Sequence, residues 1–176
     1  MARLYLLIDG YNLMHADGLG SRPESRSQAE HNRAEFLRRL LRKLNPDLHS
    51  DTVIIFDGTA AEGLLVSTVN HGIAIRFAGP QSDADTEIEK MLAAHSSPKQ
   101  VLIVSSDHRL HKAAARRRAM AIDSDVFWEL IEDVDAEEWP SSLHHFNSRY
   151  GDHDRSRPID PQEIELPDDF LDFDGR

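Results

Sequence analysis

The sequence predicts an α/β fold with a central, mainly parallel sheet of about five strands. Short apolar segments typical of buried strands alternate along the chain with segments in which apolar residues recur at helical spacing. This alternation favours parallel strands covered by helices on both faces, which is a three-layer α/β/α sandwich. The chain contains no internal repeat.

Five segments have the pattern of strands. The first is a short apolar run that is bounded by Gly10, and the second is β-branched and ends at Asp57 and Gly58. The third alternates between apolar and polar residues, and the remaining two are short apolar runs. The expected strands are residues 3–9, 52–58, 72–77, 100–107 and 120–122.

Four segments have the pattern of helices. Residues 28–44 carry a leucine-rich stripe that ends at Asn45 and Pro46. Ser82 is expected to cap a helix over 83–95, and Ser124 a helix through Ile131. A further helix is expected over residues 108–118. Gly18, Gly20 and Pro23 predict that residues 10–26 form a loop.

Length and composition indicate one soluble domain with an acidic tail. The 176 residues include no cysteine, which excludes disulfides and thiolate metal sites and is typical of a reducing cytoplasm. No apolar stretch is long enough to cross a bilayer, so we expect no membrane association. We assign residues 1–150 to the domain and residues 151–176 to a flexible acidic tail. The sequence does not indicate an oligomeric state.

The charge is unevenly distributed, which matters for a polyanionic partner. The formal net charge is −11, but residues 151–176 hold nine acids and three bases. Residues 33–43 hold five bases and one acid, and residues 109–118 hold five bases and no acid. A clustered basic surface can therefore attract nucleic acid despite the negative total. The acidic tail could lie on these basic segments and compete with nucleic acid for them.

Four aspartates are expected to meet at one edge of the sheet. Asp9, Asp57 and Asp107 each follow an apolar strand, and Asp85 opens the helix after the third strand. The functional crevice of an open α/β sheet lies outside the carboxyl ends of its strands. Helical spacing puts Asp85, rather than Asp83, on the buried face of its helix. Taken singly, each aspartate is also an ordinary helix cap or turn residue.

Such a cluster of carboxylates favours a divalent cation, because the charges repel at low dielectric. Oxygen donors without cysteine or a matched histidine pair suit Mg²⁺ or Mn²⁺ rather than Zn²⁺. Ions of this kind can support in-line hydrolysis of a phosphodiester. Asn12 adds a neutral amide that can orient water or a phosphate oxygen.

Basic and aromatic residues near these aspartates are candidates for contacts with a nucleic-acid strand. Arg109, Lys112 and Arg116 lie on the helix that begins beside Asp107, where they can hold phosphates or form an ordinary solvated face. Tyr11 can stack on a base or pack on the sheet edge.

Two other classes of enzyme are disfavoured. A haloacid dehalogenase-type phosphatase and a P-loop NTPase each need a sequence motif that is missing here.

Four segments together resemble a known family. LLIDGYNLMH (6–15), VIIFDG (53–58), DADTEIEKML (83–92) and VLIVSSDHRL (101–110) resemble, in order and spacing, the YacP-like NYN domains of the PIN-like nuclease superfamily. The resemblance covers residues 3–132. It implies a PIN-like sandwich, a Mg²⁺ or Mn²⁺ site, and an endoribonuclease that acts in mRNA turnover or stable-RNA processing, with RNA as partner, free or on the ribosome.

The resemblance also assigns roles by position. Asp9, Asp85 and Asp107 match the family's catalytic acids, Asn12 matches its asparagine, and Asp57 matches an acid of less certain role.

The chain departs from the family at two positions. Thr86 stands where the family often has a second acid, so Asp83 or Glu89 would have to compensate, and Arg118 stands where it tends to have glycine. The change at Thr86 keeps a non-catalytic module that binds RNA or the ribosome open as the alternative function.

Overall fold

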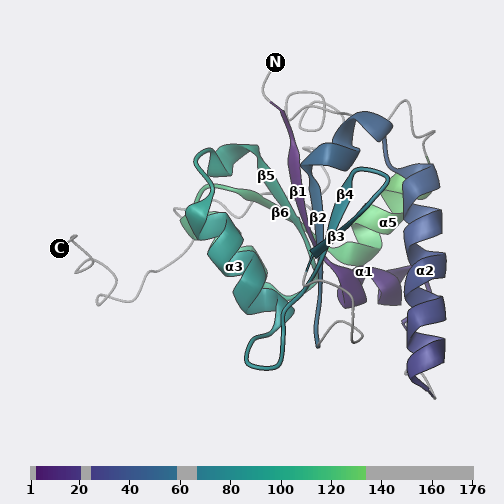
Figure 1. The fold of residues 1–176 in the computed structure, drawn as a ribbon. Coiled ribbons are helices and arrows are strands. Elements are labelled where there is room, and N and C mark those ends of the chain that lie inside the picture. The colour runs from purple at the N-terminus through teal and green to yellow at the C-terminus, as the bar shows by residue number, and fades with distance from the viewer. Residues whose placement is uncertain (1–2, 21–24, 59–66, 134–176) are drawn as a thin grey trace.

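A six-stranded sheet runs through the centre of the molecule, as the computed structural model shows for residues 3–20, 25–58 and 67–133 (Figure 1). Its spatial order is β3-β4-β2-β1-β5-β6. Neighbouring strands are parallel except β3 and β4, which are antiparallel. The strands are β1 (Tyr5–Asp9), β2 (Thr52–Phe56), β3 (Ser67–Asn70), β4 (Ile73–Phe77), β5 (Val101–Val104) and β6 (Met120–Ile122).

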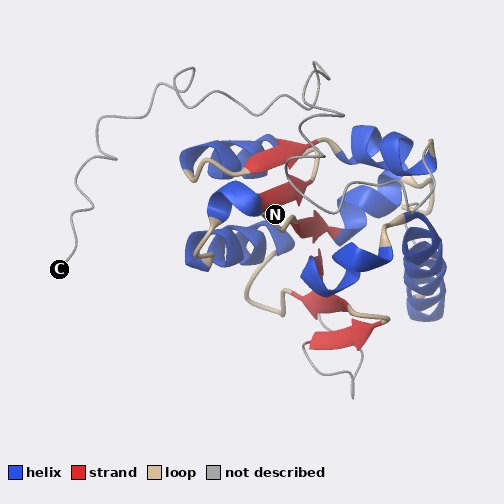
Figure 2. Ribbon diagram, turned by 90° about the horizontal axis from the view of Figure 1, so that it is seen from above, coloured by secondary structure: helices blue, strands red, loops and turns tan. Residues whose placement is uncertain are grey.

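Helices cover both faces of this sheet, which confirms the predicted α/β/α sandwich (Figure 2). The α-helices are α1 (Gly10–Ala16), α2 (Arg26–Lys43), α3 (Ala84–Ala94), α4 (His108–Arg116) and α5 (Ser124–Glu132), and the short 3₁₀ helices are η1 (Pro46–Asp51) and η2 (Pro98–Gln100). Helices α1, α2 and α5 pack on one face, and α3 and α4 pack on the other.

Each face of the sheet has its own hydrophobic core. Large side chains fill the first, where Phe36, Phe56 and Phe127 are fully buried between the sheet and helices α2 and α5. The second core is lined by smaller residues of α3 and α4, including Ala84 and Ala114, so these helices can approach the sheet closely. Both faces are covered, which explains why β1, β2 and β5 are nearly continuous apolar runs.

The prediction that residues 10–26 form a loop is wrong, because α1 follows β1 directly. The carboxylate of Asp9 caps this helix by accepting a hydrogen bond from the backbone N–H of Asn12. Gly10 then brings the helix against the sheet: a Cβ there would lie 2.4 Å from the ring of Phe56. The glycine is therefore required by packing at this junction.

The predicted caps of α3 and α5 are shifted by one residue. Asp83, rather than Ser82, caps α3 through the N–H of Thr86, while the Ser82 hydroxyl donates to Glu87. Asp123 occupies the cap position of α5, so that Ser124 is the first helical residue. Strand β3 was not predicted, because four residues at a sheet edge are too few to show a period.

Arg118 adopts a left-handed conformation at the end of α4, with φ of 56°. The N–H of Arg118 donates to the carbonyl of Ala115, and the N–H of Ala119 donates to that of Ala114. These bonds form a Schellman motif, in which this position usually holds glycine. The chain therefore ends the helix in the conformation that glycine favours while carrying an arginine.

Two sequence predictions concern residues that lie outside the described ranges. The assigned domain boundary at residue 150 and the acidic tail of residues 151–176 both belong to the segment 134–176 and stay predictions. Among the described helices, none combines the length and the apolar character that crossing a membrane requires.

Candidate metal and nucleic-acid site

The predicted acidic edge lies where the order of strands in the sheet changes direction. From β1 the chain first adds β2 and β4 on one side, and it later adds β5 and β6 on the other side. β1 is flanked by β2 on one side and by β5 on the other, and the three strands are parallel. Asp9 ends β1, Asp57 follows β2, and Asp107 follows β5 after two serines. Asp85 lies in the first turn of α3. The structure thus brings all four acids to the carboxyl edge, where such sheets bind ligands.

Asp9 is the most buried of these acids, with 8% of its surface exposed. Its Oδ1 accepts from the N–H of Asn12 at 3.1 Å, and its Oδ2 accepts from the hydroxyl of Ser105 at 3.3 Å. Burial raises the pKa of Asp9 to about 6, and the carboxylates of Asp85 and Asp57 contribute to the rise. The charge at this position is therefore costly unless a cation shares the site.

Asp85 is half-buried and accepts no hydrogen bond from the residues that the structure describes. Its pKa is raised by burial and by the carboxylate of Asp107, while the guanidinium of Arg109 opposes the rise. Of the four acids, Asp85 therefore has the carboxylate with the fewest hydrogen bonds to the described residues. This makes Asp85 the best candidate for a ligand to a cation.

Asp57 and Asp107 each use one oxygen to hold a helix start. Asp57 accepts from the backbone N–H of Ala84 at 2.7 Å, which ties the end of β2 to α3. Asp107 caps α4 by accepting from the N–H of Arg109 at 2.7 Å. Both aspartates thus have the structural role that was one reading of the sequence. Each carboxylate keeps a second oxygen for another partner.

Asn12 and Ser105 connect two of the segments that carry the acids, the junction of β1 with α1 and the loop after β5. The side-chain oxygen of Asn12 accepts from the N–H of Ser106 at 3.1 Å, so it fixes α1 against the loop after β5. Ser105 is fully buried; its hydroxyl donates to Asp9 and accepts from the N–H of Asp107 at 3.1 Å. Sequence reasoning missed Ser105, and the only signal was a small polar residue directly after a buried strand.

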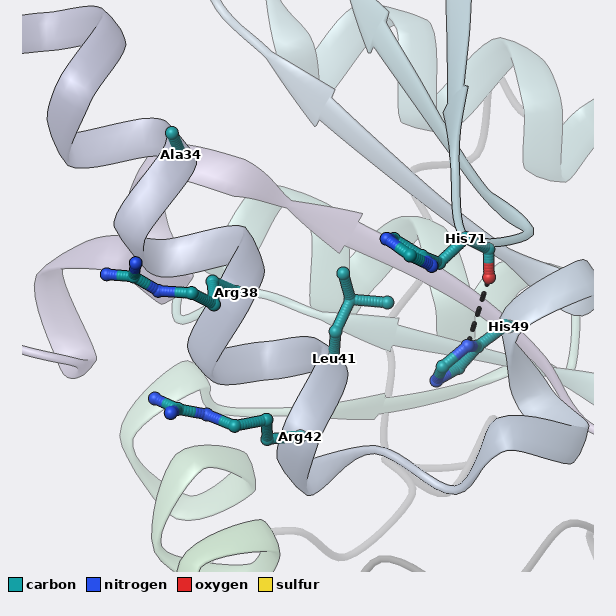
Figure 3. A pocket seen from close by; sticks show the side chains of 6 residues that line it. All are labelled: Ala34, Arg38, Leu41, Arg42, His49 and His71. Atoms are coloured by element: carbon teal, nitrogen blue, oxygen red, sulfur yellow. Dashed lines mark hydrogen bonds between the residues drawn. The ribbon is translucent and has the colours of Figure 1, made fainter.

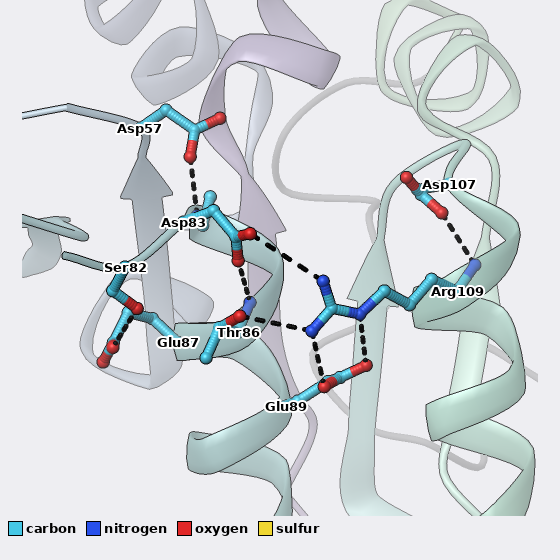
Figure 4. A network of polar contacts seen from close by, with 9 residues as sticks. Asp57, Ser82, Asp83, Thr86, Glu87, Glu89, Asp107 and Arg109 are labelled. Carbon is cyan, nitrogen blue, oxygen red and sulfur yellow. Dashed lines mark hydrogen bonds and ion pairs between the residues drawn. The ribbon is translucent and has the colours of Figure 1, made fainter.

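Arg109 forms a network across the gap between α3 and α4 (Figure 4). Its guanidinium donates to both carboxylate oxygens of Glu89, at 2.9 and 3.0 Å, and to the hydroxyl of Thr86 at 3.2 Å. It also lies 3.8 Å from the carboxylate of Asp83. Glu89 holds the pKa of Arg109 above its ordinary value. Asp83 and Glu89, the acids expected to compensate for Thr86, are therefore both engaged by this cation.

Of the other residues suggested for RNA contacts, Tyr11 lies beside the acidic edge, whereas Lys112 and Arg116 lie further along α4, which leads away from that edge. Tyr11 is half-buried, and its ring packs edge-on against Phe56 with centroids 5.1 Å apart. Its hydroxyl accepts from Arg33 at 3.0 Å. Lys112 and Arg116 are exposed on α4. Tyr11 thus packs on the sheet edge, the second of its two interpretations, and keeps part of its surface exposed.

The chemistry of the ligand atoms at the acidic edge suits a hard divalent cation. The four aspartates supply hard oxygen donors, and the pKa values of Asp9 and Asp85 are raised by burial and then by neighbouring carboxylates, a cost that a cation would relieve. In the described parts of the chain, however, no three histidine or acidic side chains lie close enough together to hold one ion. The carboxylates are thus close enough to raise one another's pKa values, but they are not grouped closely enough to coordinate one ion.

The fold and the acidic edge together define a nuclease-like α/β domain. The comparison with protein-family models agrees, because the YacP-like NYN domain matches residues 6–166. The chain therefore belongs to the YacP-like NYN domain family, and a nuclease-like, RNA-related function follows from that membership. No curated protein matches the sequence.

Solved structures with a similar fold include two of Rae1 (YacP) from Bacillus subtilis. A tryptophan-to-leucine mutant of that protein has a TM-score of 0.54 and 21% sequence identity, over 74% of this chain and 76% of that chain. A second structure of Rae1 has a TM-score of 0.52 and 22% identity, over 73% and 74% of the two chains. At this identity the likeness concerns the fold.

Proposed function

We propose that this protein is an endoribonuclease that depends on Mg²⁺ or Mn²⁺ and hydrolyses RNA phosphodiester bonds. The observation that carries the proposal is the position of four aspartates, Asp9, Asp57, Asp85 and Asp107, at the carboxyl edge of the sheet. Burial of the Asp9 carboxylate beside other carboxylates costs stability unless a cation shares the site, so this arrangement at a ligand-binding edge supports a functional role. Membership in the YacP-like NYN family supports the same conclusion.

In this proposal the four aspartates have different roles. Asp9, Asp85 and Asp107 would hold the cation and position the attacking water once the ion draws their carboxylates together, since no three ligands of the described residues are grouped closely enough without it. Asp57 would act as an outer ligand. Asn12 orients water or a phosphate oxygen through the amide nitrogen, since its oxygen is held by Ser106. A bound Mg²⁺ or Mn²⁺ would polarise the phosphate and lower the pKa of the attacking water. No side chain acts as a covalent nucleophile.

The RNA strand would be held by basic residues beside these acids. Arg109 contacts Glu89 through two of its nitrogens and is exposed, so a phosphate oxygen can approach the remaining N–H groups. Lys112 and Arg116 continue the basic surface along α4. The exposed part of Tyr11 offers a face for a base on the opposite side. The substrate in the cell can be free RNA or RNA on the ribosome, in the cytoplasm.

A second candidate function is an RNA- or ribosome-binding module that does not cut. Thr86 favours it, because this residue binds Arg109 where the family often has an additional acid. The lack of three closely grouped ligands among the described residues favours it too.

The test is cleavage of labelled single-stranded RNA and of polysomal RNA with Mn²⁺ present. Asp9→Asn and Asp85→Asn are compared with wild type and with Asp47→Asn, which removes an exposed carboxylate of η1 at the amino end of β2, the opposite edge of the sheet. We expect fragments with the wild type and with Asp47→Asn, and none with the other two variants. Binding without cleavage by the wild type would instead favour the non-catalytic module.

A further inference from the structure

A groove of about 590 Å³ lies beside α2, away from the acidic edge (Figure 3). Its lining comes from three elements: helix α2, the 3₁₀ helix η1, and the turn between β3 and β4. The lining residues are Ala34, Arg38, Leu41, Arg42, His49 and His71. Two of them are guanidinium groups, two are imidazoles, and none is an acid.

The groove lies at the opposite edge of the sheet from the four aspartates. His49 precedes β2 and His71 precedes β4, so both lie at the amino ends of parallel strands. Helix α2 runs antiparallel to β1 and connects the two edges (Figure 1). Its Arg33 contacts Tyr11 and the ring of Phe77 near the acidic edge. Arg42 follows nine residues later, about 14 Å further along the helix axis.

The positive charge of the groove lies on the side that helix α2 forms. Figure 3 shows the guanidinium groups of Arg38 and Arg42 on one side of Leu41 and the two imidazole rings on the other. Arg42 is exposed and forms no ion pair with any residue that the structure describes. Arg38 pairs with Glu35, which also binds Arg39. The cation of Arg42 is therefore the less neutralised of the two.

One apolar side chain lies between the two sides of the groove. Leu41 is half-buried and lies between the arginines and the imidazole rings (Figure 3). A strand of nucleic acid combines charged phosphates with bases that have apolar faces. The cationic side formed by Arg38 and Arg42, next to the apolar surface of Leu41, matches this combination.

The side formed by the histidines is fixed to the body of the protein. Each ring nitrogen of His49 lies at hydrogen-bond distance from a backbone oxygen, Nδ1 at 3.1 Å from His71 and Nε2 at 3.2 Å from Leu44. Gly72 has a φ of 94°, and a Cβ there would lie 3.2 Å from the Cβ of His49. The turn and η1 therefore pack closely, and the groove exists before any ligand binds.

We propose that this groove is an exosite that binds a second segment of the RNA whose scissile bond lies at the acidic edge. The inference rests on the proposed function for its choice of RNA. A strand that leaves the acidic edge beside Tyr11 and Arg33 follows α2 to Arg38 and Arg42. Phosphates contact the guanidinium groups, and bases lie over Leu41. Length of RNA, rather than sequence, then determines how much affinity the groove adds.

The test compares an Arg38→Gln/Arg42→Gln double variant with a Lys90→Gln/Lys99→Gln double variant, which removes equal charge from the α3 side of the sheet. Binding to a short and a long oligouridylate is measured in EDTA over a range of salt concentrations. We expect the groove variant to bind the long RNA about tenfold more weakly at low salt. Its slope of log K against log salt falls in magnitude by about 1.4, for two lost contacts of about 0.7 each. The short RNA and the lysine variant show no such loss.

Cleavage with Mn²⁺ separates this inference from the proposed function. If the wild type cuts RNA but both double variants bind the long RNA equally, the exosite is wrong and the nuclease stands. If the wild type does not cut but the groove variant alone loses affinity for long RNA, the groove stands and the nuclease does not. Tighter RNA binding by the groove variant would overturn the exosite, since it would indicate that an acidic segment of this chain occupies the groove.

Discussion

The hydroxyl of Ser105 donates to the carboxylate of Asp9 across the paired strands β1 and β5, although the two residues lie 96 positions apart in the chain. The same hydroxyl accepts from the N–H of Asp107. One buried side chain therefore sets the position of two of the acids that we assign to catalysis. Groups that orient metal ligands in this manner commonly affect metal affinity as much as the ligands do.

Replacing Ser105 by alanine should weaken the response to Mn²⁺ more than it weakens the fold. The carboxylate of Asp9 loses a donor and Asp107 loses an acceptor, so we expect about 10- to 100-fold weaker metal dependence of cleavage. The cost in stability should be about 1–2 kcal/mol. Titration of Mn²⁺ in the cleavage assay measures the first effect, and urea denaturation measures the second. Ser106→Ala is the matched control, because its hydroxyl accepts from Ser124 and does not touch Asp9; equal Mn²⁺ responses of the two variants would contradict the role of Ser105.

Replacing Asp9 by asparagine should stabilise the metal-free protein at neutral pH. Because the pKa of Asp9 is raised to about 6 in the folded protein, from 3.8 in the unfolded chain, its ionisation costs stability as the pH rises from about 4 to above 6. The variant avoids this cost, which amounts to at most about 3 kcal/mol. Urea denaturation in EDTA should show the gain at pH 7.5 and none at pH 4. A variant less stable than the wild type at pH 7.5 would show that the hydrogen bonds of the carboxylate outweigh its burial.

Removing the charge of Arg109 should move the acidic limb of the cleavage pH profile to higher pH. The guanidinium lowers the pKa of Asp85, so Arg109→Gln lets that carboxyl keep its proton to a higher pH. Cleavage that requires ionised Asp85 then begins at a higher pH. The profile of kcat/KM against pH measures this shift. Lys112→Gln removes one positive charge from α4 and should leave the limb in place; identical profiles for wild type and Arg109→Gln would rule out the coupling.

Replacing Arg118 by glycine should stabilise the protein by about 1 kcal/mol. The left-handed conformation at this position costs an arginine about 1–2 kcal/mol, part of which is returned because glycine is more disordered in the unfolded chain. Urea denaturation compares Arg118→Gly with Arg118→Ala, which removes the same charge and keeps a Cβ. Equal stability of the two variants would show that the strain is absent.

The sequence was informative where chemistry depends on topology. Asp9, Asp57 and Asp107 were expected at one edge because apolar runs that end in acids, once placed in a parallel sheet, must bring those acids together. Helical spacing also separated Asp85 from Asp83, and the structure has Asp83 at the cap and Asp85 inside the first turn.

The sequence was not informative where a contact joins distant segments. The pair of Arg109 with Glu89 and the bond of Ser105 to Asp9 depend on how α3, α4 and β5 lie against β1. Helix α1 was missed for a local reason. Its seven residues are too few to show a period, and its stability comes from the Asp9 cap and from packing near Phe56.

The position of β1 between β2 and β5 has a consequence for the timing of biosynthesis. A nascent chain acquires Asp9 first and can pair β1 with β2 early, since both precede residue 57. The other side of β1 stays open until β5 has been made, and only then can Ser105 and Asp107 join Asp9. The proposed hydrolytic centre is thus completed only after residue 107 has been made, so a shorter nascent chain carries no assembled centre near the message that encodes it.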